Sequence, residues 1–428
     1  MAAPLLTTKL YIPPPRPDLV PRPRLIQRMD EGLRLRRKLT LVSAPAGFGK
    51  TTAITQWILD SPREIAWLSV DEGDNDPVQL LHYLIAALQP VDGRIGATVQ
   101  QVLQSPQVPS TQNLVTMLVN DIGAAATATT LVLDDYQLIT APEAHQVVAF
   151  LLEYQPPNLH LILGSRQDPT LSLPRLRARN QVTEVREPDL RFTIEEATDF
   201  LTRTIDLPLS PEEIATLESR TEGWITGLHL AAVAALSRGE TPSHMLHQAG
   251  VEPEGSKAFI SAFAGDDRYV LDYLVGEVLQ GQPEETRRFL RQTAVVDRLT
   301  ASLCDVLTGR EDSQTVLEQL EATNLFVIPI DHRREWYRYH RLFAEALRAT
   351  LDMQEQMDLH QRAAHWYEAH GYMNEAIKHA LAYASISDDM DEAERLIRRA
   401  ADATIHAGNL MTVAGWLDAL PDDRVRTS

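Results

Sequence analysis

The ten residues "SAPAGFGKTT", from Ser43 to Thr52, have the types and spacing of a phosphate-binding loop. Gly49, Lys50 and Thr51 match the end of the pattern G-x-x-x-x-G-K-[ST], and Ala44 stands where that pattern has its first glycine. A glycine turn between a strand and a helix directs backbone N–H groups and the helix dipole toward an anion. We expect Lys50 to contact the β- and γ-phosphates of a nucleotide and the Thr51 hydroxyl to bind Mg²⁺.

Ala44 adds one methyl group where the loop leaves its strand, while the two inner glycines, Gly47 and Gly49, are retained. A structural glycine turn without a ligand is the alternative, but the order of strand, loop and helix favours a nucleotide site. The expected nucleotide contacts of the loop are Ala46, Gly47, Phe48, Gly49, Lys50, Thr51 and Thr52.

Two further segments end in residues that suit ATP chemistry. "TLVLDDYQLI" is an apolar strand that ends in acid, so we expect Asp134 to face Mg²⁺. Asp135 either orients the attacking water or lies behind Asp134 as a second acid that does not contact the nucleotide itself. "LHLILGSRQDP" ends in Arg166, which either contacts the γ-phosphate or forms a salt bridge. The expected catalytic residues are therefore Lys50, Asp135 and Arg166.

The elements that position these residues follow a strand–helix alternation. Short apolar runs ("LTLVSAP", "IAWLSVD", "TLVLDDY", "LHLILGS" and the weaker "VTEVRE") are continuously hydrophobic, as in parallel strands buried on both faces. Helical segments separate them, which predicts an α/β P-loop NTPase with a parallel sheet. "IAWLSVD" intervenes between the loop and the acid, which indicates the ATPase branch whose two motif strands are separated in the sheet.

Strands become rare after about residue 190, where Thr193 and Glu196 form a capping-box pattern. "NLFVIPIDHRREWYRYHRLF" predicts a hairpin followed by a helix, and paired Ala-rich helices after it resemble tetratricopeptide-like (TPR-like) repeats. The expected domains are an N-terminal lead at 1–37, the P-loop ATPase at 38–190, a helical domain at 191–250, a winged-helix arm at 255–350, and the beginning of a TPR-like α-superhelix at 352–428.

Composition limits the partners. The formal net charge is −19, so the chain as a whole repels nucleic acid and anionic membrane. A single cysteine, Cys304, cannot form an internal disulfide and fits a reducing compartment. No secretory leader or membrane-spanning run is apparent, so we expect a cytoplasmic protein without a membrane partner.

The motifs together resemble one family. "APAGFGKTT", "LVLDDYQLI", "LILGSRQDP", "LRFTIEEATDFL", "EGWITGLHLAA", "DDRYVLDYLVGEVL" and "WYRYHRLFAEAL" occur in the order found in the ATPase half of MalT-type LuxR-family regulators, which are signal-transduction ATPases with numerous domains (STAND). Alanine in the first loop position is normal in that family. The resemblance covers nearly the whole chain.

The resemblance implies further residues and partners. Arg22 and Arg24 would contact the base and ribose side of the nucleotide, and His340 would touch the diphosphate in a closed form. Gln137 stands where relatives often carry histidine, which leaves the role of that position open. ADP would hold the resting form, and ATP with a small-molecule or protein inducer would drive self-association.

The resemblance also implies DNA binding through a C-terminal domain that this chain lacks, and we interpret the chain as the front part of a longer protein. Hydrolysis is expected to be slow, because faster ATPases of this branch commonly place glutamate where Asp135 stands. Two alternatives are an ATPase switch of an antiviral or effector-assembly protein and a free-standing ATP-consuming enzyme, although no further catalytic cluster supports the latter.

Overall fold

The computed structural model describes residues 5–14, 19–59, 61–103, 109–204, 209–237, 263–406 and 410–420. These form two compact units, one of residues 1–262 with 322–324 and one of residues 263–321 with 325–428. Within the described residues, no helix combines the length and the apolar character needed to cross a membrane.

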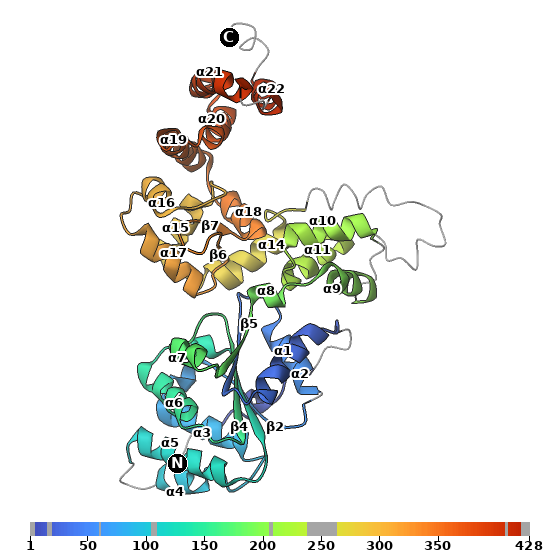
Figure 1. Cartoon of the computed structure of the whole chain (residues 1–428), viewed down its shortest axis with the longest axis vertical. Helices are drawn as coiled ribbons and strands as arrows, with labels where there is room; N and C mark the ends of the chain where they lie inside the picture. The colour runs from blue at the N-terminus through green and yellow to red at the C-terminus, as the bar shows by residue number, and fades with distance from the viewer. Residues whose placement is uncertain are drawn as a thin grey trace, which may run out of the picture. The chain divides into compact units, whose positions relative to one another are not determined.

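The first unit is built on a five-stranded parallel sheet (Figure 1). Its strands are β1 (Leu39–Ser43), β2 (Glu64–Ser69), β3 (Thr129–Asp134), β4 (Leu159–Ser165) and β5 (Val182–Arg186), in the spatial order β2-β3-β4-β1-β5. The predicted α/β class and all five predicted strands are confirmed. The two motif strands β1 and β3 are separated, as predicted, and the strand between them is β4, whereas β2 lies at the edge.

Helices cover both faces of this sheet. One face carries α1 (Pro23–Arg34) and α2 (Lys50–Leu59); the other carries α3 (Pro77–Leu88), α5 (Thr111–Ala124) and α6 (Pro142–Glu153). Helices α4 (Ala97–Leu103) and α7 (Leu173–Ala178) and the short 3-10 helices η1 (Thr7–Leu10), η2 (Glu72–Asn75) and η3 (Tyr136–Leu138) complete this part. Strands β1, β3 and β4 are entirely buried, which explains their continuous hydrophobicity.

A helical segment of the first unit follows the sheet. It consists of α8 (Glu187–Leu190), α9 (Ile194–Asp199), the π-helix η4 (Phe200–Thr204), α10 (Pro211–Thr221) and α11 (Ile225–Ser237). The predicted capping box is present at the start of α9, where Thr193 accepts from the Glu196 N–H and Glu196 accepts from the Thr193 N–H.

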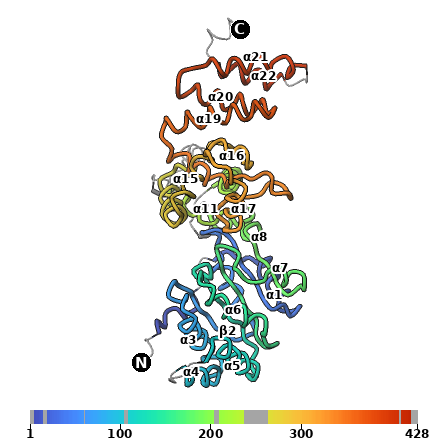
Figure 2. Tube along the Cα trace, turned by 90° about the vertical axis from the view of Figure 1, so that its left-hand side faces the viewer, coloured from blue at the N-terminus to red at the C-terminus, as the bar shows by residue number. Residues whose placement is uncertain are grey.

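The second unit begins with α14 (Arg268–Tyr273), the π-helix η5 (Leu274–Leu279), α15 (Glu284–Thr293), α16 (Ala301–Thr308) and α17 (Ser313–Ala322). The predicted hairpin is present as antiparallel strands β6 (Val327–Pro329) and β7 (Tyr337–Tyr339), and α18 (Arg341–Ala349) follows it. Helices α19 (Met353–Ala369), α20 (Met373–Ser387), α21 (Asp391–His406) and α22 (Leu410–Asp418) then pack in succession (Figure 2). Cys304 is buried in α16, so its thiol is a core group.

Candidate nucleotide-binding site

The phosphate loop connects the end of β1 at Ser43 to the start of α2 at Lys50. Gly47 and Gly49 have φ angles of 79° and 74°, in the left-handed region that disfavours a side chain. A Cβ added at Gly47 would also lie 2.5 Å from the hydroxyl oxygen of Thr226. Both inner glycines are therefore required by the backbone path and, at Gly47, by close packing.

Lys50 is held by the loop itself. Its Nζ donates to the carbonyls of Ala44 and Pro45, at 2.9 Å each, and its side chain is buried. Burial, together with the Arg166 charge, lowers the pKa of Lys50 to about 8 against the opposing effect of Asp135 and Asp134. Among the described residues, the hydrogen bonds of this buried ammonium group go to neutral carbonyls, which favours an additional anionic partner such as a phosphate.

The next two carbonyls of the loop are bonded from the helical segment. The Trp224 indole Nε1 donates to the Ala46 carbonyl at 3.1 Å, and both the backbone N and the hydroxyl of Thr226 donate to the Gly47 carbonyl, at 3.2 and 3.0 Å. Trp224 is fully buried and contacts the loop directly. With these carbonyls fixed, the peptide planes are oriented for phosphate binding through N–H groups.

Thr51 and Asp134, the predicted Mg²⁺ ligands, are in contact with each other. The Thr51 hydroxyl donates to Asp134 Oδ2 at 2.7 Å, and Asp134 Oδ1 is buried without a hydrogen-bond partner in the described structure. A Cβ at Gly164 would lie 2.3 Å from that oxygen, so glycine on β4 leaves room for the carboxylate. Burial raises the pKa of Asp134 to about 6, opposed by the hydrogen bond from Thr51. A hydroxyl beside an unsatisfied carboxylate oxygen suits Mg²⁺.

Asp135, Gln137 and Arg166 are connected at the same edge of the sheet. Gln137 Nε2 donates to Asp135 Oδ1 at 2.9 Å, and the Arg166 backbone N–H donates to Gln137 Oε1 at 2.8 Å. Asp135 has a φ of 56°, unusual for a residue other than glycine. The sequence left the role of Gln137 open; the structure places its amide between two of the predicted catalytic residues.

Arg22 and Arg24 are brought together by Glu196. The nearest nitrogens of the two guanidinium groups lie 3.4 and 2.9 Å from Glu196 Oε2, and both also donate to backbone carbonyls between residues 189 and 191. Arg22 is buried and lies over the Phe192 ring at 5.1 Å. In these contacts the pair joins the start of α1 to the helical segment, and its nucleotide contact stays a prediction.

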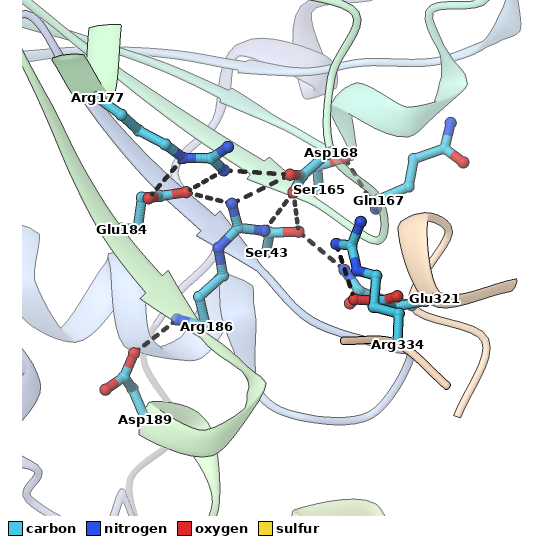
Figure 3. Close-up of polar contacts among 11 residues, drawn as sticks. Ser43, Ser165, Gln167, Asp168, Arg177, Glu184, Arg186, Asp189, Glu321 and Arg334 are labelled. Carbon is cyan, nitrogen blue, oxygen red and sulfur yellow. Dashed lines mark hydrogen bonds and ion pairs between the residues drawn. The ribbon is translucent and has the colours of Figure 1, made fainter. Parts of the chain in front are cut away.

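An ion-pair cluster fixes the carboxyl ends of β1, β4 and β5 (Figure 3). Arg186 pairs with both Asp168 and Glu184, Arg177 pairs with Glu184 at 2.8 Å, and Ser43 donates to Asp168 at 3.4 Å. The hydrogen bond from Arg177, opposed by burial and assisted by Arg186, lowers the pKa of Glu184 to about 2. These ion pairs hold together the strand ends from which the phosphate loop and Arg166 leave the sheet.

The structure thus brings most predicted residues to one sheet edge, with Thr51 and Thr52 in the first turn of α2 and Phe48 buried in the loop. His340 belongs to the second unit, where it is buried at the N-cap of α18. Its diphosphate contact stays a prediction. Sequence reasoning missed the loop contacts of Trp224 and Thr226, for which the "EGWITG" motif was the only available indication.

Known proteins resemble both parts of the chain. Residues 275–359 match the MalT winged helix domain. The HTH-type transcriptional regulator MalT of Cronobacter sakazakii is 36% identical over 386 residues, which are 90% of this chain and 41% of that protein. MalT of Serratia proteamaculans is 34% identical over 424 residues, 98% of this chain and 45% of that protein. The chain therefore spans less than half the length of these curated relatives.

A solved Walker-type ATPase of Pyrococcus abyssi superposes with a TM-score of 0.51 at 16% sequence identity, covering 78% of this chain and 97% of that one. This likeness concerns the fold. Together with the sheet order, it confirms the predicted P-loop NTPase architecture. The match to residues 275–359 confirms the predicted winged helix.

Proposed function

We propose that this chain, which resembles MalT regulators over nine tenths of its length and carries their winged helix domain, is an ATP- and ADP-binding switch module of a transcriptional regulator. The observation that carries the proposal is the pairing of Thr51 with Asp134 beside the buried Lys50 in a strand–loop–helix unit. ADP holds a closed resting state and ATP an open, self-associating state; DNA is bound through another part of the regulator.

The chain's own groups suit the binding step. The loop N–H groups and Lys50 bind the β- and γ-phosphates, while Thr51 and Asp134 hold Mg²⁺. When bound, Mg²⁺ neutralises charge on the phosphate oxygens. Lys50 exchanges its contacts with Ala44 and Pro45 for phosphate oxygens, which are stronger acceptors because they are charged.

Hydrolysis serves to reset the switch. Asp135 orients the attacking water and Arg166 contacts the γ-phosphate in this proposal. The short aspartate side chain reaches less far than a glutamate, which makes hydrolysis slow. A slow ATPase suits a switch, since the ATP state must persist long enough to assemble.

The helical segment is suited to respond to the nucleotide. Trp224 and Thr226 bond the Ala46 and Gly47 carbonyls, so a change in the loop's peptide planes on phosphate binding acts directly on the start of α11. A ligand shifts a conformational equilibrium only by its differential affinity for the two states. The contacts of Trp224 and Thr226 would make nucleotide affinity depend on the position of α11, because the loop that they contact is the one that binds the phosphates in this proposal.

The test combines binding and size measurements on the whole chain. Calorimetry with ADP and with ATP, each with Mg²⁺, should show 1:1 binding, and light scattering should show a larger assembly with ATP than with ADP. Failure to bind either nucleotide would refute the nucleotide site. Binding with identical size in both states would leave an ATP-binding module but contradict the switch.

A further inference from the structure

The Gln137 side chain joins two neighbouring strand ends. Asp135 directly follows β3 and Arg166 directly follows β4, and these strands pair in parallel with Leu133 opposite Leu163. Gln137 lies in η3 and spans the gap, 2.9 Å from Asp135 Oδ1 and 2.8 Å from the Arg166 nitrogen.

The partners determine how the amide is oriented. An ionised carboxylate only accepts hydrogen bonds, and a backbone N–H only donates. The NH₂ group of Gln137 must therefore face Asp135 and its oxygen must face Arg166, as the structure has it. A side chain that donates at one end and accepts at the other is required here, and glutamine meets this requirement without a net charge.

The surroundings keep this bridge in place. Tyr136, next to Gln137 in η3, is buried, and its hydroxyl lies 3.0 Å from His145 Nδ1 on α6. The Leu138 N–H donates to the Asp135 carbonyl at 3.0 Å, which closes the turn around the left-handed residue. Asp135 is therefore fixed through its backbone by the turn and through its carboxylate by Gln137.

We propose that Gln137 is a positioning residue for ATP hydrolysis, which holds the Asp135 carboxylate in register with the strand end that presents Arg166. The proposal rests on the proposed function, because it assigns to Asp135 and Arg166 the water-orienting and γ-phosphate roles given there. Gln137 acts through these two residues and has no phosphate contact of its own in this scheme.

A space-filling role for Gln137 predicts a different ranking of substitutions. Gln137→Glu preserves the size of the side chain and the oxygen that accepts from the Arg166 N–H. It also places a second carboxylate beside that of Asp135, and the two negative charges repel each other. Gln137→His retains one donor and one acceptor nitrogen, and Gln137→Ala removes both. If Gln137 positions Asp135, hydrolysis should be fastest in the wild type, slower in Gln137→His, slower again in Gln137→Ala and slowest in Gln137→Glu. If Gln137 only fills space, Gln137→Glu should be the least affected of the three variants.

The experiment measures single-turnover ATP hydrolysis with Mg²⁺ at pH 8 on the whole chain, together with ADP affinity by calorimetry. We expect Gln137→Ala to lower the hydrolysis rate constant at least about tenfold while the Kd for ADP stays within about twofold, because misplacement of a reacting group costs rate more than binding. Gln137→Glu should be slower still, and Gln137→His should recover part of the loss. Gln167→Ala is the matched control, since Gln167 is a glutamine at the same edge whose side chain extends away from the cluster in Figure 3.

The outcomes are distinguishable. A wild-type chain that binds no nucleotide overturns the proposed function. A wild type that hydrolyses ATP while the Glu variant matches or exceeds the Ala variant overturns only the positioning role. The positioning role is also overturned if Gln137→Ala hydrolyses ATP at the wild-type rate or faster. An ADP affinity near that of the wild type shows that a slow variant is folded.

Discussion

Two cationic sites of the first unit were both expected to meet the nucleotide, and they differ in how their charge is balanced. Arg22 and Arg24 share the carboxylate Glu196. Lys50 donates to two neutral carbonyls instead, at 2.9 Å each, and its burial lowers its pKa. We call the contacts of Arg22 and Arg24 with Glu196 the clasp. In this structure the clasp joins α1 to the helical segment, whereas Lys50 is a buried cation whose hydrogen bonds to neutral carbonyls favour an added anion.

The clasp keeps its carboxylate ionised despite burial. Burial raises the pKa of Glu196, but the hydrogen bond from Arg24 and the Arg22 charge outweigh it, and the net shift is downward. A carboxylate that stays ionised between two arginines stabilises the fold at neutral pH, and that contribution is lost as pH falls through its pKa. The difference between the two sites can be tested by removing each charge in turn.

The largest effect is expected for Glu196→Gln on stability. Removing one partner of a buried pair leaves an uncompensated charge on Arg22, which is 4% exposed, and costs on the order of 3 kcal/mol in the free energy of unfolding. Urea denaturation of the wild type and the variant measures this loss. Glu153→Gln is the control, since Glu153 and its partner Arg175 are 49% and 52% exposed. A variant as stable as this control would show that the arginines need no countercharge from Glu196.

The next effect is on binding. Lys50→Ala should weaken the binding of ADP and of ATP by about 1.5–3 kcal/mol, which is the contribution of a charge-assisted hydrogen bond. Lys38→Ala is a matched control, because Lys38 Nζ also donates to two backbone carbonyls, of Leu152 and Glu153, but at the start of β1 rather than beyond its end. Calorimetry should find the control near wild type. Equal loss in both variants would mean that Lys50 acts only on the loop's structure.

The same two sites show how far the sequence could predict the molecule. The phosphate loop, Asp134 and the strands were predictable because each is contained in a contiguous segment with a fixed physical requirement, such as left-handed backbone at Gly47. The clasp was not predictable from the sequence, since Arg24 and Glu196 are 172 residues apart. No local pattern indicates which carboxylate will meet which arginine, because that depends on how the helical segment packs against the sheet.

A smaller effect is expected when pH is changed, both on the stability of the chain and on its affinity for ADP. The pKa of Lys50 is lowered to about 8 from 10.5, so between these values the unfolded chain binds more protons than the folded one. Stability of the nucleotide-free chain should therefore rise as pH increases through that window. ADP affinity should do the opposite and fall about tenfold from pH 7 to pH 9, since phosphate requires the charged amine.

Calorimetry at the two pH values measures this fall, and Lys50→Ala should abolish it. Arg22 does not contribute, because its pKa, lowered to about 10 by burial, lies above the range. A pH dependence that persists in the Lys50 variant would assign the titration to another group.

The smallest effect concerns Trp224, which separates the loop's own contacts from those supplied by the helical segment. Trp224→Phe keeps most of the buried ring but removes the indole donor to the Ala46 carbonyl, whose bond is worth about 0.5–1.5 kcal/mol. The loop carbonyl then lacks its partner and the peptide plane is less well fixed, so ADP affinity should fall between about twofold and tenfold. Trp67→Phe is the control, because the buried Trp67 also loses one indole hydrogen bond, but that bond goes to Ser69 on the edge strand β2 and not to a loop carbonyl. If both variants bind ADP as the wild type does, the loop is preorganised by Lys50 and its glycines alone, and the helical segment only covers it.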